Sequence, residues 1–168
     1  MNRRHRIAWV LVLVVDAGFV AWGVMAAAFP DHLLGPAGKP ILPAGYEGYT
    51  GGAWPELVSS SPTTAEYIEI LFRMYGVFNV IVGLMGVAIA TTAFRRGDGW
   101  AWWTLLVANT MALGSAMTYD RTVNAIGPFE LSEYLGLVLV YLALAITAPL
   151  RTAGPPIPAS PSTGYRSS

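Results

Sequence analysis

The chain has 168 residues, of which 54% are hydrophobic and 12% are charged, and its formal net charge is zero. Soluble domains carry about 25% charged residues, so this composition is typical of a membrane protein, and the neutral balance excludes the basic footprint of a nucleic-acid-binding domain. Cysteine is absent and both histidines lie outside the apolar segments, which excludes disulfides, thiolate metal sites and a haem or metal held by histidines between helices.

The first apolar segment covers residues 7–29 and ends before Pro30. It is long enough to cross a hydrocarbon core of roughly 30 Å, which needs about 20 residues. The basic start and the alanines at 26–28 also fit a signal peptide with a small-residue cleavage site. Because the apolar part of a signal peptide has about 7 to 15 residues, the longer segment favours a retained transmembrane helix.

A loop rich in proline and glycine follows at residues 30–66, and we expect no regular helix in it. Its last residues, Thr63-Thr64-Ala65-Glu66, form a capping-box pattern that predicts the start of a second helix. This second apolar segment covers residues 67–94.

The rest of the chain offers two further spans and a tail. "RRGDG" at 95–99 is a tight polar turn, and apolar segments follow at 100–117 and 131–150. Residues 151–168 are rich in Pro, Ser and Gly and are expected to form a disordered cytoplasmic tail. The prediction is an all-α protein in which residues 1–150 form a four-helix transmembrane bundle.

Charge predicts the orientation of this bundle. In a four-span arrangement, the arginines that fall on one side are Arg3, Arg4, Arg6, Arg95, Arg96, Arg151 and Arg166. Most acidic residues fall on the other side or at its boundary. Because an excess of Lys and Arg marks the cytoplasmic side, we expect both termini in the cytoplasm, the long loop outside, and a multi-pass protein of the plasma membrane.

One polar side chain from each predicted span reaches the middle of the membrane. These residues are Asp16, Asn79, Asn109 and Tyr141. Asp16 and Asn109 each lie about 13 Å from the cytoplasmic end of their span, at 1.5 Å per residue. A lipid-facing carboxylate at this depth costs roughly 2.5–3.5 kcal/mol, so Asp16 is expected to face protein, where amides and a hydroxyl supply donors.

A second polar layer lies toward the outer side. It contains Glu69, Arg73, Asp120, Arg121 and Glu133, with Tyr119 and Tyr134 beside them. Glu69 and Arg73 are four residues apart on one helix and are expected to pair, and Arg73 is also in reach of a carboxylate at the outer ends of the third and fourth helices. Along the membrane normal Arg73 is about 10 Å from Asp16, which is too far for a direct pair.

Small residues recur every seven positions along the second span. The repeat consists of Glu69, Gly76, Gly83 and Ala90, and Asn79 and Gly86 each follow one of its glycines by three. Such a seam lets helix backbones approach closely and lets polar side chains bond between helices. Asp16 and Asn109 lie on similar repeats in the first and third spans, so we expect the mid-membrane polar residues to converge.

Each of these polar groups has two interpretations. Asparagines on a glycine-rich seam act as packing contacts between helices or as ligand-binding groups, and outer carboxylates are solvated or line a site. An intramembrane acid indicates function by default, and the alternative for Asp16 is a neutral, hydrogen-bonded structural role.

Templates for catalysis are missing. No Ser-His-Asp arrangement is possible in the membrane without a histidine there, and no phosphate-binding GxxxxGK[ST] loop occurs. We therefore predict no catalytic residues, no metal site and no cofactor, and an enzyme is the least favoured class.

Residues 73–106, "RMYGVFNVIVGLMGVAIATTAFRRGDGWAWWTLL", resemble a stretch of small uncharacterised four-helix bacterial membrane proteins, the loosely defined DoxX-like group. The residues that carry the resemblance are Arg73, Gly76, Gly83, Arg95-Arg96-Gly97 and Trp100-Ala101-Trp102. It implies a four-helix bundle and no established activity.

The leading functional hypothesis is that the polar interior binds or passes a small ligand or a proton. The expected partners are the lipid bilayer and a small apolar or lipid-like ligand. The alternative is a non-catalytic accessory or assembly subunit, whose seams pack against a larger membrane protein or a second copy.

Overall fold

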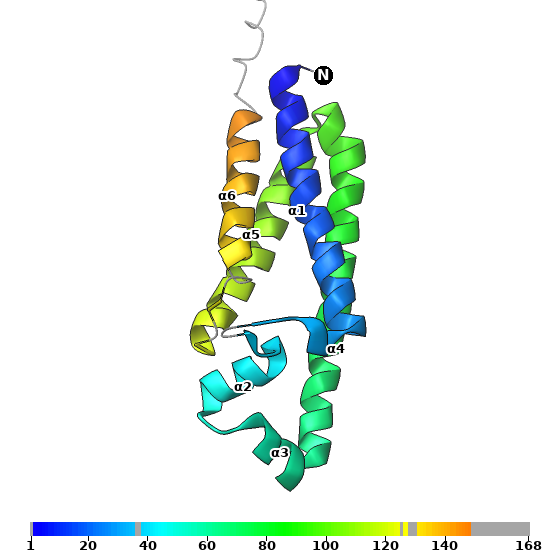
Figure 1. Ribbon diagram of the computed structural model, residues 1–168. Helices are drawn as coiled ribbons and strands as arrows, with labels where there is room; N and C mark the ends of the chain where they lie inside the picture. The colour runs from blue at the N-terminus through cyan, green and yellow to red at the C-terminus, as the bar shows by residue number, and fades with distance from the viewer. Residues whose placement is uncertain (1, 36–37, 125, 128–130, 149–168) are drawn as a thin grey trace, which may run out of the picture.

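The computed structural model describes residues 2–35, 38–124, 126–127 and 131–148. Within these ranges the chain is helical and contains no β-strand, which confirms the all-α prediction. The helices are α1 (Arg3–Ala28), α2 (Ile41–Thr50), α3 (Trp54–Ser60), α4 (Pro62–Ile89), α5 (Gly99–Thr122) and α6 (Leu131–Ile146). The four long helices α1, α4, α5 and α6 run along one another, and α2 and α3 form a small lobe at one end (Figure 1).

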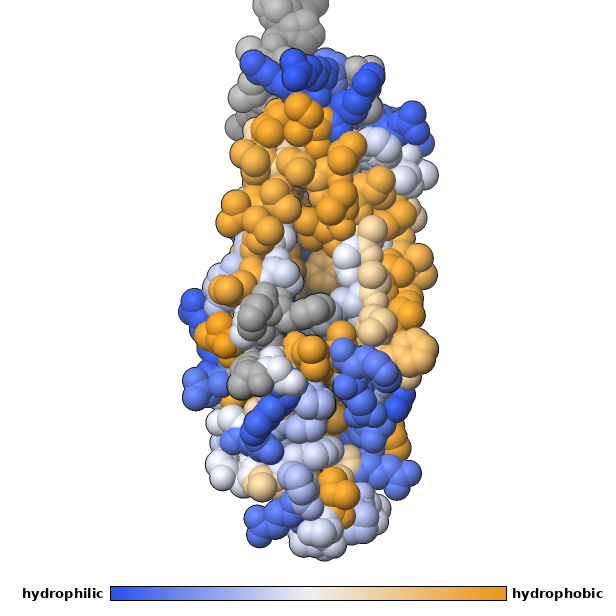
Figure 2. Space-filling model, in the orientation of Figure 1, coloured by the Kyte–Doolittle hydropathy of each residue, from blue (hydrophilic) through white to orange (hydrophobic). Residues whose placement is uncertain are grey.

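The two ends of the bundle differ in chemistry. One end, the arginine end, carries Arg3, Arg4 and Arg6 at the start of α1 and Arg95 and Arg96 after α4. The opposite end, the lobe end, is covered by α2 and α3. Figure 2 shows a wide hydrophobic band between a hydrophilic arginine end and a largely hydrophilic lobe end.

Among the residues that the structure describes, two helices are long and apolar enough to cross a membrane. They are α1 and the α4 segment continued to Phe94. α6 is apolar but has 16 residues, fewer than the roughly 20 that a crossing needs. α5 does not meet the same criterion, because tryptophans, threonines and Asn109 lower its hydropathy. The structure thus contains four long helices, but the prediction that all four cross a membrane stays a prediction.

The expectation that residues 30–66 contain no regular helix is wrong. α2 and α3 lie in this segment, together with a short 3-10 helix at Pro30–His32. Pro43 and Pro55 fall in the first turns of α2 and α3, where a backbone N–H has no helical partner to lose. Proline is therefore compatible with both helices, because each proline lies in a first helical turn.

The second long helix also starts earlier than expected. α4 begins at Pro62 with Ser61 as its N-cap residue, five residues before the predicted start at 67, and Ser61 Oγ lies 2.7 Å from Thr64 Oγ1. The capping-box pattern at 63–66 thus lies inside the first turns of the helix. Pro62 at the first helical position is preorganised for a helix start, because its ring fixes φ.

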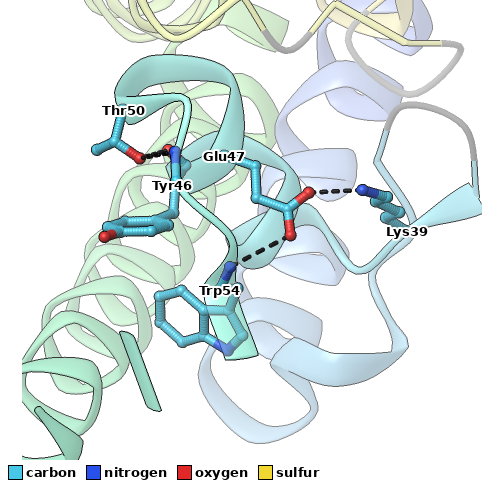
Figure 3. Close-up of polar contacts among 6 residues, drawn as sticks. Lys39, Tyr46, Glu47, Thr50 and Trp54 are labelled. Carbon is cyan, nitrogen blue, oxygen red and sulfur yellow. Dashed lines mark hydrogen bonds and ion pairs between the residues drawn. The ribbon is translucent and has the colours of Figure 1, made fainter. Parts of the chain in front are cut away.

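Polar contacts hold the lobe together (Figure 3). The carboxylate of Glu47 accepts hydrogen bonds from Lys39 Nζ at 2.5 Å and from the Trp54 backbone N–H at 3.3 Å, which joins α2 to the start of α3. The hydrogen bond from Lys39 is the main cause that lowers the pKa of Glu47 below its usual value. The rings of Tyr46 and Trp54 meet edge to face at 5.5 Å.

The lobe lies directly on the end of α5. Gly48 of α2 faces the backbone carbonyl of Val123, so closely that a Cβ there would overlap its oxygen, and the Cβ position of Gly45 is 3.4 Å from the Tyr119 hydroxyl. The glycines of this loop thus allow close packing of a helix, whereas the sequence interpretation took them as evidence against a helix.

The turn between α4 and α5 has the predicted polar, tight form. A π-helical turn at Ala90–Phe94 continues α4, Gly97 has φ of +86°, and α5 begins at Gly99. Only glycine adopts this left-handed conformation readily. The predicted tail at 151–168, with Arg151 and Arg166, lies outside the described residues.

The hydrophobic core lies in the half of the bundle between the arginine end and Asp16, which we call the arginine half. It contains Ala8, Val12, Ala90, Ala93, Phe94, Ala101, Leu105, Val140, Ala143 and Leu144. All four long helices contribute to it. The remaining half, between Asp16 and the lobe, is the lobe half, and it holds the site described next.

Candidate functional site

The predicted glycine seam places α1 against α4. A Cβ on Gly76 would lie 2.6 Å from the Ala27 backbone nitrogen, and one on Gly83 would lie 2.7 Å from the Asp16 carbonyl oxygen. Gly23 of α1 faces the Gly76 carbonyl in the same way, at 2.6 Å. Backbones this close exclude any side chain, which confirms the seam and explains its composition.

Asp16 lies at the middle of α1 and is 1% exposed. Its carboxyl group occupies the space that Gly86 leaves open, since a Cβ on Gly86 would lie 2.6 Å from both carboxyl oxygens. The Asn109 side chain of α5 interacts with this carboxyl group. Asp16 Oδ2 and Asn109 Oδ1 have no hydrogen-bond partner among the described residues, so each side chain of the pair keeps one buried oxygen without a hydrogen bond.

The other two mid-membrane residues do not join this pair. Asn79 lies one helical turn nearer the lobe end than Gly83. Its side-chain amide donates a hydrogen bond to the Tyr75 carbonyl at 2.9 Å, and the side chain lines a cavity. Tyr141 is 42% exposed, and its hydroxyl lies 3.1 Å from Thr110 Oγ1. The structure thus brings Asp16 and Asn109 together, turns Asn79 toward the cavity and leaves Tyr141 outside the interior.

Glu69 and Arg73 form the predicted ion pair, with Nη2 and Nε of the arginine 2.6 and 3.0 Å from Glu69 Oε1. Arg73 Nη1 also donates to the Ala27 carbonyl at 2.8 Å. The last carbonyls of a helix have no helical partner and carry its negative partial charge, so the guanidinium caps α1. This is the partner that Arg73 takes in place of a carboxylate on α5 or α6.

Asp120 and Glu133 are brought together from α5 and α6. Both line the same cavity, Asp120 is 7% exposed, and both charges act on the Tyr75 hydroxyl group. Antiparallel α5 and α6 put the end of one helix beside the start of the other, so two acids separated in sequence line one cavity. The hydrogen bonds of Arg73 go to Glu69 and to the end of α1.

Two adjoining cavities open in the lobe half. The larger, of about 490 Å³, lies between α1, α4 and α5 and is covered by Ile41 and Leu42 of α2. The smaller, of about 430 Å³, lies between α1 and α6. Figure 2 shows the hydrophobic surface hollowed between its two walls. The residues that line both cavities are Trp22, Tyr75, Ala116 and Glu133.

Aromatic side chains form a wall that the sequence interpretation missed. Trp22 of α1 meets Tyr75 and Phe72 of α4 edge to face, at 5.4 and 6.2 Å between ring centres, and Tyr119 of α5 also lines the larger cavity. The signal available in the sequence was the Phe72–Tyr75 spacing at the depth of Trp22 on the facing helix.

Metal binding has no candidate site in the part of the chain that the structure describes, because no three His, Cys, Asp or Glu side chains are grouped there to hold an ion. The pair of acids at Asp120 and Glu133 is thus a polar feature of the cavity.

Comparison with known proteins assigns no family to the chain, since no family model, no curated protein and no solved structure matches it. The functional argument therefore rests on the geometry of the cavity and of the buried polar residues.

Proposed function

We propose that the protein is a multi-pass membrane protein of the DoxX-like type whose four long helices cross the bilayer and whose lobe half binds a small apolar or lipid-like ligand. The observation that carries this proposal is the pair of adjoining cavities, of about 490 and 430 Å³. Small-molecule sites occupy about 300–1,000 Å³ and have apolar walls with few polar groups, and these cavities have that size and lining.

The surface supports the membrane location. Large apolar side chains such as Met111, Val138 and Leu84 are exposed on three different helices, and the apolar band of Figure 2 encircles the visible face between the two hydrophilic ends. Exposed apolar surface of this extent marks contact with lipid or with a partner. α5 and α6 run beside α1 over the same depth (Figure 1), which favours their crossing with it.

The arginines support an orientation with the arginine end in the cytoplasm and the lobe outside. A reporter that is active only outside the cytoplasm is expected to be active when fused at Gly51, in the lobe, and silent when fused at Gly97, in the α4–α5 turn. Activity at Gly97 would reverse the proposed orientation.

The packing favours binding over passage. A path for ions or protons through a membrane is lined by polar groups or water. In the arginine half, Val12, Leu105, Val140 and Leu144 fill the space between the helices. The polar interior ends at Asp16 and Asn109, so the cavity is a pocket with a packed apolar base.

Ala116 offers the sharpest test, because it lines both cavities. Ala116→Phe is expected to fill the shared space and displace the ligand. The matched control is Gly114→Phe, two residues earlier on α5, where an added Cβ meets no atom within 4 Å. We expect native mass spectrometry after gentle extraction to find a bound lipid or small molecule in the wild type and the control and none in Ala116→Phe.

Other outcomes separate the proposal from its alternative. A stoichiometric protein partner in place of a small molecule would support an accessory or assembly subunit. Equal ligand occupancy in the wild type and Ala116→Phe would overturn the assignment of the cavity as the binding site.

A further inference from the structure

The chemistry of the larger cavity selects among ligands. The aromatic residues that line it are Trp22, Phe72, Tyr75 and Tyr119. Aromatic faces attract cations, and quaternary ammonium groups are recognised by clusters of such rings. An aromatic wall by itself accepts any apolar group, so the charged residues decide which ligand fits.

The charged side chains among the described residues of both cavity linings are Asp120 and Glu133, and both are acidic. Arg73 and Arg121 lie near in sequence but do not line either cavity. Arg73 binds Glu69 and the end of α1, and the guanidinium of Arg121 lies over the Tyr134 ring, 5.8 Å from its centre. The cavity thus presents aromatic rings and carboxyl groups at its lobe end.

The smaller cavity has a different character. Val14, Phe19, Leu135 and Leu139 line it, and Val14 and Leu135 are exposed on the hydrophobic band. Its mouth therefore faces the region that the proposed function assigns to lipid chains. Because Trp22 and Glu133 belong to both cavities, an apolar chain in the smaller cavity would place its end group in the larger one.

We propose that the ligand is a cationic amphiphile, a single apolar chain that carries an amine or quaternary ammonium group. The chain lies in the smaller cavity between α1 and α6, and the cationic group lies in the larger cavity against Trp22 and Tyr75, beside Asp120 and Glu133. This inference rests on the proposed function and adds the charge of the ligand to it.

Three probes with the same chain test the inference: dodecyltrimethylammonium, dodecanol and dodecanoate. Binding is measured by isothermal titration calorimetry to the full-length protein in zwitterionic nanodiscs, with empty nanodiscs as the reference for partitioning. We expect the cation to bind at least about tenfold more tightly than dodecanol, and dodecanoate to bind most weakly.

Charge-neutral variants locate the effect. Glu133→Gln and Asp120→Asn are expected to reduce the preference for the cation toward the level of dodecanol, and Glu133→Asp is expected to retain it. Glu66→Gln, an exposed acid on α4 outside both cavity linings, is the control and should leave the preference unchanged. Circular dichroism of each variant shows whether the helices are retained.

The two proposals fail in different ways. If dodecanol or dodecanoate binds as tightly as the cation, or if the preference persists in both neutral variants, the inference about charge is overturned while the apolar binding site stands. If none of the three probes binds above the empty-nanodisc reference, the proposed function itself is overturned.

Discussion

The same four helices are packed in one half of the bundle and open in the other. In the arginine half, alanines such as Ala8, Ala90, Ala101 and Ala143 lie between the helices and let them approach closely. In the lobe half, the aromatic side chains of Trp22, Phe72, Tyr75 and Tyr119 take their place around a cavity. The size of the side chains at the interface therefore determines where the bundle is solid and where it can hold a ligand.

One interface is shared by both halves. In the lobe half, α1 and α4 are in contact from Gly23 and Gly76 to Asp16 and Gly86. In the arginine half, Ala8 and Val12 of α1 belong to the same core cluster as Ala90 and Ala93 of the π-helical turn that continues α4.

The largest effect is expected at the shared interface. Gly83→Leu should abolish the folded bundle, because even the first added carbon would lie 2.7 Å from the backbone oxygen of Asp16, where no side-chain movement relieves the overlap. Val82→Leu, next to it and 37% exposed, should change the free energy of unfolding by less than about 0.5 kcal/mol. Thermal unfolding in detergent measures both. Similar melting temperatures for the two variants would refute the seam.

A smaller effect should separate the two halves. Ala8→Phe places a large ring in the packed core, where Ala8 is fully buried, and should destabilise the protein by about 1–3 kcal/mol or more. Ala116→Phe enters the cavity and should be close to neutral in stability. Thermal unfolding without added ligand provides the comparison. Equal destabilisation by both substitutions would show that the lobe half is as tightly packed as the arginine half.

Asp16 lies on the boundary between the halves. The effect of substituting it should depend on the polarity and charge of the new side chain more than on its volume. Asp16→Leu removes the partner of Asn109 and should cost about 1–3 kcal/mol, because a buried amide loses its interaction. Asp16→Asn preserves the shape and should fold normally, but an amide does not titrate in the way that a carboxyl group does. We expect this variant to lose the part of the pH dependence of stability or ligand binding that arises from titration of Asp16.

The Asp16 experiment covers about pH 5 to 9 with wild type and both variants. Identical pH and ligand responses in wild type and Asp16→Asn would assign Asp16 to structure alone and favour the accessory-subunit alternative.

The smallest effect is expected in the lobe. Because the hydrogen bond from Lys39 lowers the pKa of Glu47 in the folded protein, the contact stabilises the lobe fully above the unfolded-state pKa of about 4.3, and this stabilisation is lost as the pH falls through the folded-state pKa. Glu47→Gln should therefore speed amide hydrogen exchange slightly in α2 and α3 at neutral pH and have no effect in acid. An effect of equal size at both pH values would exclude the carboxylate as its cause.

Local sequence patterns predicted several features correctly. The Glu69–Arg73 pair depends only on helical spacing, and the glycine repeat of α4 depends on the seven-residue period of a helix seam. Helix positions were less accurate in the loop, because the positions of Pro43 and Pro55 within a first turn depend on where the turn begins. The proline content of this loop predicted an absence of helix, whereas the structure has the first turns of α2 and α3 at these prolines.

Other features depend on rotation and distance between helices. Tyr141 and its neighbour Val140 differ by one residue, yet Val140 is buried and Tyr141 is exposed, because successive residues of a helix point about 100° apart. Depth in the membrane was predictable for both residues, but the direction of each side chain was not. The same limit applies to Arg73, whose contact with the Ala27 carbonyl requires the end of α1 to lie beside it.

Residue type and spacing along single chain segments predict the helical class, the long apolar helices, the glycine seam and the polar residues near the middle of those helices. The tertiary structure is needed for three other features: Asp16 fits against Gly86, Asp120 and Glu133 line one cavity, and aromatic side chains from three helices line that cavity as well. These features arise from the packing of segments far apart in the chain, where the sizes of facing side chains set the space that is left between them.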